Sequence, residues 1–195
     1  MQIGVDSFGA SSLSPLRALP SVRSSAWRIY WKRLSSLTRL VRMFSVSANT
    51  IGSEFVDSAP VVILGATAAR TKNIRLTSTV TVLSAADPVR IFQEFATLDL
   101  ISHGRAEIVA GRGSSIEAFP LFGFDLDDYD SLFSEKLGLL LKIREDTRVR
   151  WTGKHRAPLT GQAVYPRPLQ NPLPIWVGAR GIPNHSFVPV RSDFR

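Results

Sequence analysis

Residues 110–115 read AGRGSS and place two glycines, an arginine and two hydroxyl side chains after a short apolar run. Glycine lets backbone N–H groups approach an anion closely, and the Arg112 guanidinium can hold a phosphate through two parallel hydrogen bonds. The stretch lacks the lysine of a P-loop and the spacing of a dinucleotide-binding GxGxxG motif. The residues alone leave two interpretations open, a phosphate-binding turn and a structural turn between a strand and a helix.

Small residues also follow other apolar runs of the chain. Ser78, Thr79 and Val80 lie in a β-branched stretch, where they suit either the rim of a flat ligand or an ordinary strand. Gly178 and Gly181 follow the apolar residues 174–177. If these runs are neighbouring parallel strands, their carboxyl ends form a common edge at which a ligand can bind.

The acidic run 125–130 and the histidines do not form a metal-binding pattern. The run begins like a calcium-binding loop, but Asp130 stands where that loop needs glycine and Lys136 where it needs glutamate. The histidines lie far apart in the sequence, at His103, His155 and His185. We therefore predict that the protein binds no metal, that the acidic run is a solvated helix start, and that His103 completes a helix end.

Alternating strand and helix patterns must position these residues. Strand-like runs occur at 2–8, 73–84, 105–113 and 174–179. Helical patterns occur at 55–71, at 86–104 and from about Tyr129 to Arg144, and residues 151–174 are typical of a proline-rich loop. Ser58 and Asp87 are the expected N-caps of the first two helices, with Pro88 in the first turn and Gly104 after the end of the second. This order predicts an α/β fold with a parallel sheet, either a (β/α)8 barrel or an open doubly wound sheet.

Composition and charge narrow the class of protein. The 195-residue chain is 44% hydrophobic and 21% charged, as is typical of a globular protein. Its net charge of +8 is concentrated in residues 1–52, which hold seven basic residues and one acidic residue. The basic segment 17–42 makes nucleic-acid binding an alternative function, although the segment carries no nucleic-acid-binding fold signature. Because the chain has no cysteine, no long apolar run and no signal-peptide pattern, we predict a cytoplasmic protein without membrane or nucleic-acid partners.

Several motifs together resemble one known family. ADPVR at 86–90, ATLDLISHGR at 96–105, GRG at 111–113 and YPRPLQNPLPIWVGA at 165–179 follow in this order. In this combination the chain resembles the bacterial luciferase-like flavin-dependent monooxygenases, from about Glu54 to Gly181 and again at 2–8. The resemblance implies a TIM-type barrel that uses reduced FMN, or in some relatives F420, to activate oxygen or transfer hydride on a small organic substrate. It also implies a separate flavin reductase as partner and a homodimer for an intact member.

The resemblance assigns cofactor contacts to residues already singled out. These are Ser78, Thr79, Val80, Arg112, Gly113, Gly178 and Gly181. The first three lie against the isoalloxazine ring in this interpretation, Arg112 holds the flavin phosphate, and Gly178 and Gly181 border the phosphate end. No catalytic residue follows from the resemblance.

One part of the family pattern is missing. Residues 47–52, SANTIG, stand where the family has a Glu-His-His-type strand end, and no histidine precedes His103. Codons permitted for these residues encode Glu-His-His-Arg when read one base earlier, and the same offset turns residues 27–35 into an acidic amphipathic helix. We therefore hypothesise that about 11–52 and 184–195 are out-of-frame sequence.

The reading-frame hypothesis changes what we expect of the chain. We expect a single incomplete barrel domain over 1–195, containing only the N-terminal part of a fold that typically needs about 250 residues. A chain of this kind leaves sheet edges exposed, so we predict that as written it folds poorly and has little activity. A catalytically dead flavin-binding remnant is the alternative function.

Overall fold

The computed structural model describes residues 4–7, 43–46, 58–113, 116–178 and 187–190. The main sheet has the order β1-β2-β3-β5-β8-β9, with β4 also paired to β5. Its strands are β1 Gly4–Ser7, β2 Met43–Val46, β3 Arg75–Ser78, β4 Thr81–Val82, β5 Ala106–Gly111, β8 Ile175–Gly178 and β9 Phe187–Pro189. All pairings are parallel except that of β8 with β9. The predicted α/β class and parallel sheet are confirmed.

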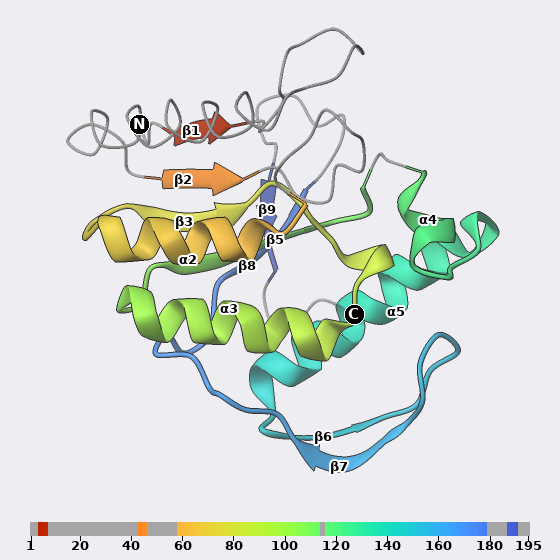
Figure 1. The fold of residues 1–195 in the computed structure, drawn as a ribbon. Coiled ribbons are helices and arrows are strands. Elements are labelled where there is room, and N and C mark those ends of the chain that lie inside the picture. Colours follow the sequence, from red (N-terminus) through yellow and green to blue (C-terminus); the bar gives the residue numbers. More distant parts are fainter. Residues whose placement is uncertain (1–3, 8–42, 47–57, 114–115, 179–186, 191–195) are drawn as a thin grey trace, which may run out of the picture.

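Helices pack on the sheet and bury the main core (Figure 1). They are α2 Pro60–Arg70, α3 Pro88–Ser102 and α5 Tyr129–Glu145, with the short α4 Ala118–Leu121 and the 3-10 turns η1 Leu83–Ala85 and η2 Leu126–Asp128 between them. Phe92, Phe95 and Leu98 of α3 are almost completely buried against the sheet. Because these apolar residues recur every three or four positions, α3 presents one continuous apolar stripe to the core.

The ends of α3 follow the capping rules. The Asp87 carboxylate accepts hydrogen bonds from the N–H groups of Val89 (2.8 Å) and Arg90 (3.3 Å). At the other end His103 adopts the left-handed conformation, with φ of 57°, and the Gly104 N–H donates to the Asp99 carbonyl at 2.9 Å. The predicted N-cap and the helix-ending role of His103 are confirmed.

Three expectations about the elements were wrong in detail. The first helix begins at Pro60 with Ala59 rather than Ser58 at its N-cap, because Pro60 fits the first helical turn. The strand expected at 73–84 divides into β3, β4 and η1. The expected loop at 151–174 contains most of an antiparallel hairpin, β6 Arg148–Trp151 with β7 Leu159–Ala163, because its residues pack against α5 instead of continuing the sheet.

Arg105 ties α2, α3 and β3 together. Its guanidinium donates to the carbonyls of Ser102 (2.7 Å), Ile74 (2.8 Å), Ala68 (3.1 Å) and Thr71 (2.9 Å), and to the Thr71 hydroxyl (3.0 Å). Burial lowers the pKa of Arg105. The last carbonyls of a helix lack partners within the helix, so this side chain completes the hydrogen bonding where the helices meet the sheet.

Asp99 joins the loop before β8 to the same region. Its fully buried carboxylate accepts hydrogen bonds from the Ala106 N–H (3.2 Å) and from the Gln170 backbone N–H (2.9 Å) and side-chain amide (2.7 Å). The same amide donates to the Ala106 carbonyl at 2.7 Å. Residues of the ATLDLISHGR and YPRPLQNP motifs therefore form one structural junction, which we call the α3–β5 junction: Asp99, Arg105 and Gln170.

Candidate functional site

The candidate site lies where β4, β5 and β8 end. In the sheet, Val82 is paired with Gly111 and Ala110 with Val177. Since these strands are parallel, their carboxyl ends share one edge. The structure thus brings the stretch at 78–80, the turn at 111–113 and Gly178 to one place, as the sequence predicted.

Val80 packs over two of the glycines at this edge. A Cβ atom added at Gly111 would lie 2.4 Å from Val80 Cγ2, and one added at Gly178 would lie 3.0 Å from Val80 Cγ1. Gly113 has φ of +83°, and a Cβ there would lie 2.6 Å from Val82 Cγ1. These glycines are therefore needed for the close packing of Val80 and Val82, because a side chain at any of them would overlap a valine.

The polar residues of the 78–80 stretch differ in accessibility. Ser78 is fully buried, and its hydroxyl lies 2.5 Å from the Thr81 hydroxyl. Thr79 and Val80, which are joined by a cis peptide bond, are half-buried. Of the three residues predicted to face a ring, Thr79 and Val80 thus present side-chain surface, whereas the Ser78 hydroxyl is paired inside the protein.

Arg112 extends from the turn toward the start of α5. Its side chain is 45% exposed, its Nε lies 3.1 Å from the carboxylate of Asp130, and its guanidinium carbon lies 4.7 Å from the centre of the Phe133 ring. The Tyr129 hydroxyl donates to the Gly113 carbonyl at 2.6 Å. The first turn of α5 therefore holds both the side chain and the backbone of the glycine turn.

Lys136 lies further along α5 and is buried, with 4% of the residue exposed. Its Nζ donates to the Ser84 carbonyl at 2.5 Å and lies 3.7 Å from the centre of the Phe124 ring. Loss of hydration on burial lowers the pKa of Lys136 to about 8, although the nearby carboxylates of Asp87 and Glu135 act in the opposite direction.

The buried position of Lys136 was not predicted from the sequence. The available signal was its spacing, since it lies three residues after Phe133 and four before Leu140, on the apolar side of the helix.

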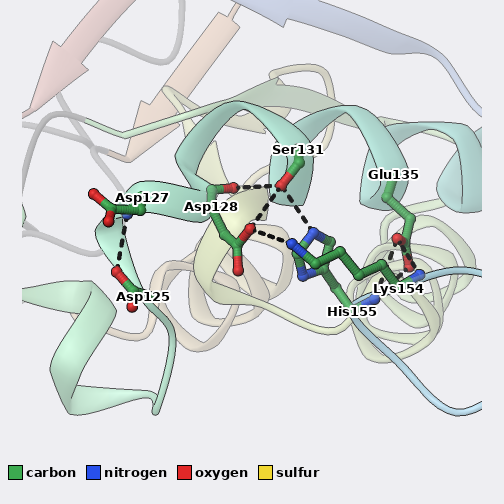
Figure 2. A network of polar contacts seen from close by, with 7 residues as sticks. All are labelled: Asp125, Asp127, Asp128, Ser131, Glu135, Lys154 and His155. Atoms are coloured by element: carbon green, nitrogen blue, oxygen red, sulfur yellow. Dashed lines mark hydrogen bonds and ion pairs between the residues drawn. The ribbon is translucent and has the colours of Figure 1, made fainter.

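A polar network fixes the tip of the β6–β7 hairpin to α5, as Figure 2 shows. The Glu135 carboxylate accepts from the backbone N–H groups of Lys154 (2.7 Å) and His155 (3.1 Å), and the Lys154 ammonium lies 2.7 Å from the Asp128 carboxylate. The Ser131 hydroxyl lies 2.9 Å from His155 Nε2. Glu135 bonds the main chain of His155 and not its ring, so among the described residues this serine–histidine pair has no orienting carboxylate of the kind found in a catalytic triad.

The acidic run 125–130 forms η2 and the start of α5. The Asp125 carboxylate accepts from the Asp127 N–H at 3.0 Å, and the hydrogen bond from Lys154 lowers the pKa of the Asp128 carboxyl. In the described part of the chain, no three histidine or acidic side chains are grouped so as to hold a metal ion. None of the described helices has the length and apolar character needed to cross a membrane.

Comparison with known proteins places this arrangement in a family. A sequence profile described as luciferase-like monooxygenase matches residues 44–187. The chain belongs to the luciferase-like monooxygenase family. The resemblance predicted from its motifs is confirmed.

Curated luciferase-like relatives match a little over half of the chain. An uncharacterized protein y4vJ of Sinorhizobium fredii is 33% identical over 121 residues, which are 61% of this chain and 34% of that protein. The F420-dependent glucose-6-phosphate dehydrogenase of Amycolatopsis mediterranei is 29% identical over 120 residues, 60% of this chain and 35% of that one. The chain therefore spans about a third of the length of these relatives.

Solved structures show the same luciferase-like fold. Monooxygenase RslO1 from Streptomyces bottropensis has a TM-score of 0.76 at 22% identity, over 91% of this chain and 53% of that one. The oxygenating constituent of 3,6-diketocamphane monooxygenase from Pseudomonas putida, solved with FMN, has a TM-score of 0.72 at 19% identity, over 91% and 51%. The described elements thus correspond to about half of a luciferase-like TIM-type barrel, in agreement with the predicted partial barrel.

The outcome for the predicted site residues of this luciferase-like chain differs from residue to residue. Val80, Arg112, Gly113 and Gly178 lie at one strand edge. Gly181 lies outside the described residues. Asp130 was not predicted as the partner of Arg112, although it is one of the charged residues of the acidic run 125–130.

Proposed function

We propose that the strand edge of Val80, Arg112, Gly113 and Gly178 binds reduced FMN, and that the whole protein uses it with O2 to oxidise a small organic substrate. The observation that carries this proposal is the half-exposed Arg112 guanidinium at the strand edge where the half-buried Val80 packs over Gly111 and Gly178. A flat ring system needs apolar surface, and a flavin phosphate needs a cation. When bound, the reduced flavin supplies the electrons for the chemistry.

The residues of the chain have distinct proposed roles toward the flavin. Thr79 and Val80 support the ring and keep water from one side of it. Arg112 holds the phosphate, and the left-handed backbone at Gly113 lets the main chain approach that group closely. Gly178 and Gly181 border the phosphate end. These roles carry over from the family resemblance and fit the exposure of Arg112 and the packing of Val80.

F420 is the competing cofactor, because the A. mediterranei relative is an F420-dependent enzyme. Titration of the folded, soluble fraction of the purified chain with FMN and with F420, followed by quenching of cofactor fluorescence, tests the choice. We expect FMN to bind and the Arg112→Ala variant to bind it at least tenfold more weakly. Tighter binding of F420 would replace FMN in the proposal, and binding of neither cofactor would overturn it.

The reading-frame hypothesis remains a proposal for residues 11–52 and 184–195, which lie largely outside the described part of the chain. It is supported by the run of consecutive codon matches and by the missing Glu-His-His segment. Low activity of the chain as written follows from it. Sequencing the gene through both segments is the test, and codons incompatible with the shifted reading would contradict it.

The separate flavin reductase, the homodimer, the cytoplasmic location and the absence of nucleic-acid and membrane partners stay predictions. The basic segment 17–42, on which nucleic-acid binding would depend, lies outside the described residues. A flavin-binding remnant without catalysis stays the alternative, and turnover of O2 by the flavin-loaded chain would contradict it.

A further inference from the structure

Arg112 has an internal partner at the place where the proposed function needs it to hold phosphate. Its Nε lies 3.1 Å from the carboxylate of Asp130, in the first turn of α5. The Asp130 side chain is 84% exposed, so water solvates this carboxylate whether or not it is paired with the arginine. Exposed ion pairs of this kind contribute little free energy and are readily exchanged.

The orientation of Arg112 does not depend on Asp130 alone. The guanidinium carbon lies 4.7 Å from the centre of the buried Phe133 ring, a cation–π contact that also holds the group against α5. The Tyr129 hydroxyl holds the neighbouring Gly113 carbonyl. Loss of the Asp130 pairing would therefore leave the arginine near its present position, with its charge available to another anion.

We propose that Asp130 is a built-in competitor of the flavin phosphate at Arg112. The carboxylate pairs with the guanidinium in the free protein and is displaced when the phosphate binds, so it lowers the affinity for phosphate-bearing flavins. This inference rests on the proposed function, because it concerns the same arginine. It adds a selectivity element, since a flavin without phosphate does not compete with Asp130.

The test compares two flavins on two variants. FMN and riboflavin share the ring and differ in the phosphate. Asp130→Asn removes the charge of the carboxylate but keeps its shape and one acceptor oxygen. Asp127→Asn is the matched control, because it removes an equal charge from the same acidic run without removing the partner of Arg112.

We expect Asp130→Asn to bind FMN about two- to fivefold more tightly at low salt, with riboflavin affinity unchanged. This increase in FMN affinity should be smaller at high salt. Asp127→Asn should show less than half of the increase seen for Asp130→Asn. Unchanged or weaker FMN binding by Asp130→Asn would overturn the inference, as would an equal gain for riboflavin.

A second measurement separates failure of this inference from failure of the proposed function. Phenylglyoxal modifies accessible arginines, and mass spectrometry reports its rate at Arg112. We expect faster modification of Arg112 in Asp130→Asn than in the wild type, and stronger protection by inorganic phosphate. If the wild type binds neither flavin, the proposed function fails. Equal protection of Arg112 by inorganic phosphate in the wild type and in Asp130→Asn would then overturn the inference as well.

Discussion

Arg105 and Arg112 lie seven positions apart in one strand–turn segment, yet their surroundings are opposite. At the α3–β5 junction, the Arg105 guanidinium donates to carbonyls and a hydroxyl of three elements. At the strand edge, Arg112 meets one exposed carboxylate and one aromatic ring. The first side chain is fully used in holding the fold, whereas the second is held in place with its charge accessible. The difference separates a cation that is used up in structural hydrogen bonds from one whose charge stays accessible to an anion.

The largest effect is expected from Arg105→Ala. The change leaves several buried carbonyls without donors, so the free energy of unfolding should fall by about 4 kcal/mol. Urea denaturation measures it. Arg105→Lys should recover only part of the loss, since an ammonium cannot reach all of these acceptors. A decrease in the free energy of unfolding below about 1 kcal/mol for Arg105→Ala would contradict the structural role of Arg105 and its difference from Arg112.

Lys136 supplies a third cation with a different environment. Because its pKa is lowered to about 8 from 10.5, the unfolded chain binds more protons than the folded protein between these values. The free energy of unfolding should therefore rise with pH across that window, by up to about 3 kcal/mol. Below pH 8 the folded protein carries the buried charge, and its full destabilising effect applies.

Urea denaturation at pH 7.5 and 9.5 checks the Lys136 prediction. The wild type should gain stability relative to Lys136→Met as the pH rises. Lys142→Met is the matched control, because Lys142 is an exposed lysine of the same helix, paired with Asp146. An unchanged difference between wild type and Lys136→Met at the two pH values would contradict the prediction.

The packing of Val80 over the glycines can be broken by Gly111→Ala. The added methyl group would overlap Val80, and overpacking should lower the free energy of unfolding by about 2 kcal/mol. Val80→Ala in the same chain should restore part of the loss. Gly65→Ala is the control, because a Cβ at this helical position meets no atom within 4 Å and should stabilise the protein slightly.

The smallest stability effect is expected from Arg112→Ala. This variant tests whether Arg112, unlike Arg105, contributes little to the stability of the fold. Its exposed ion pair contributes little, so the free energy of unfolding should change by less than about 0.5 kcal/mol. FMN affinity should nevertheless fall at least tenfold, as measured by fluorescence titration. A loss of stability equal to that of Arg105→Ala would make Arg112 a structural residue.

Much of the fold could be predicted because its signals are local. Asp87, Pro88 and Gly104 mark the ends of α3, and the alternation of strands and helices indicates a parallel sheet. The hairpin at 148–163 was missed because its strands do not join the sheet and its proline-rich surroundings are typical of a loop. Its attachment depends on Glu135, which bonds the backbone of residues 19 and 20 positions later.

The candidate site was predictable in part for the same reason. Val80, Arg112 and Gly178 were expected at one edge of the sheet from strand ends and family motifs, and the structure places them there, while their contacts with a cofactor stay predictions. The partner of Arg112 was not identified, since Asp130 lies 18 residues later and joins it only through the packing of α5.

The sequence by itself determined the alternation of strands and helices around α3, the ends of α3 and the family of this chain, because capping, periodicity and motifs are set by near neighbours. Only the tertiary structure decided that Arg105 donates to four carbonyls and a hydroxyl while Arg112 stays half-exposed. It also decided that the Ser78 hydroxyl pairs with Thr81 and that Lys136 is buried with a lowered pKa. Hydration and hydrogen-bond partners depend on segments that are distant in the sequence, and folding alone brings those segments together.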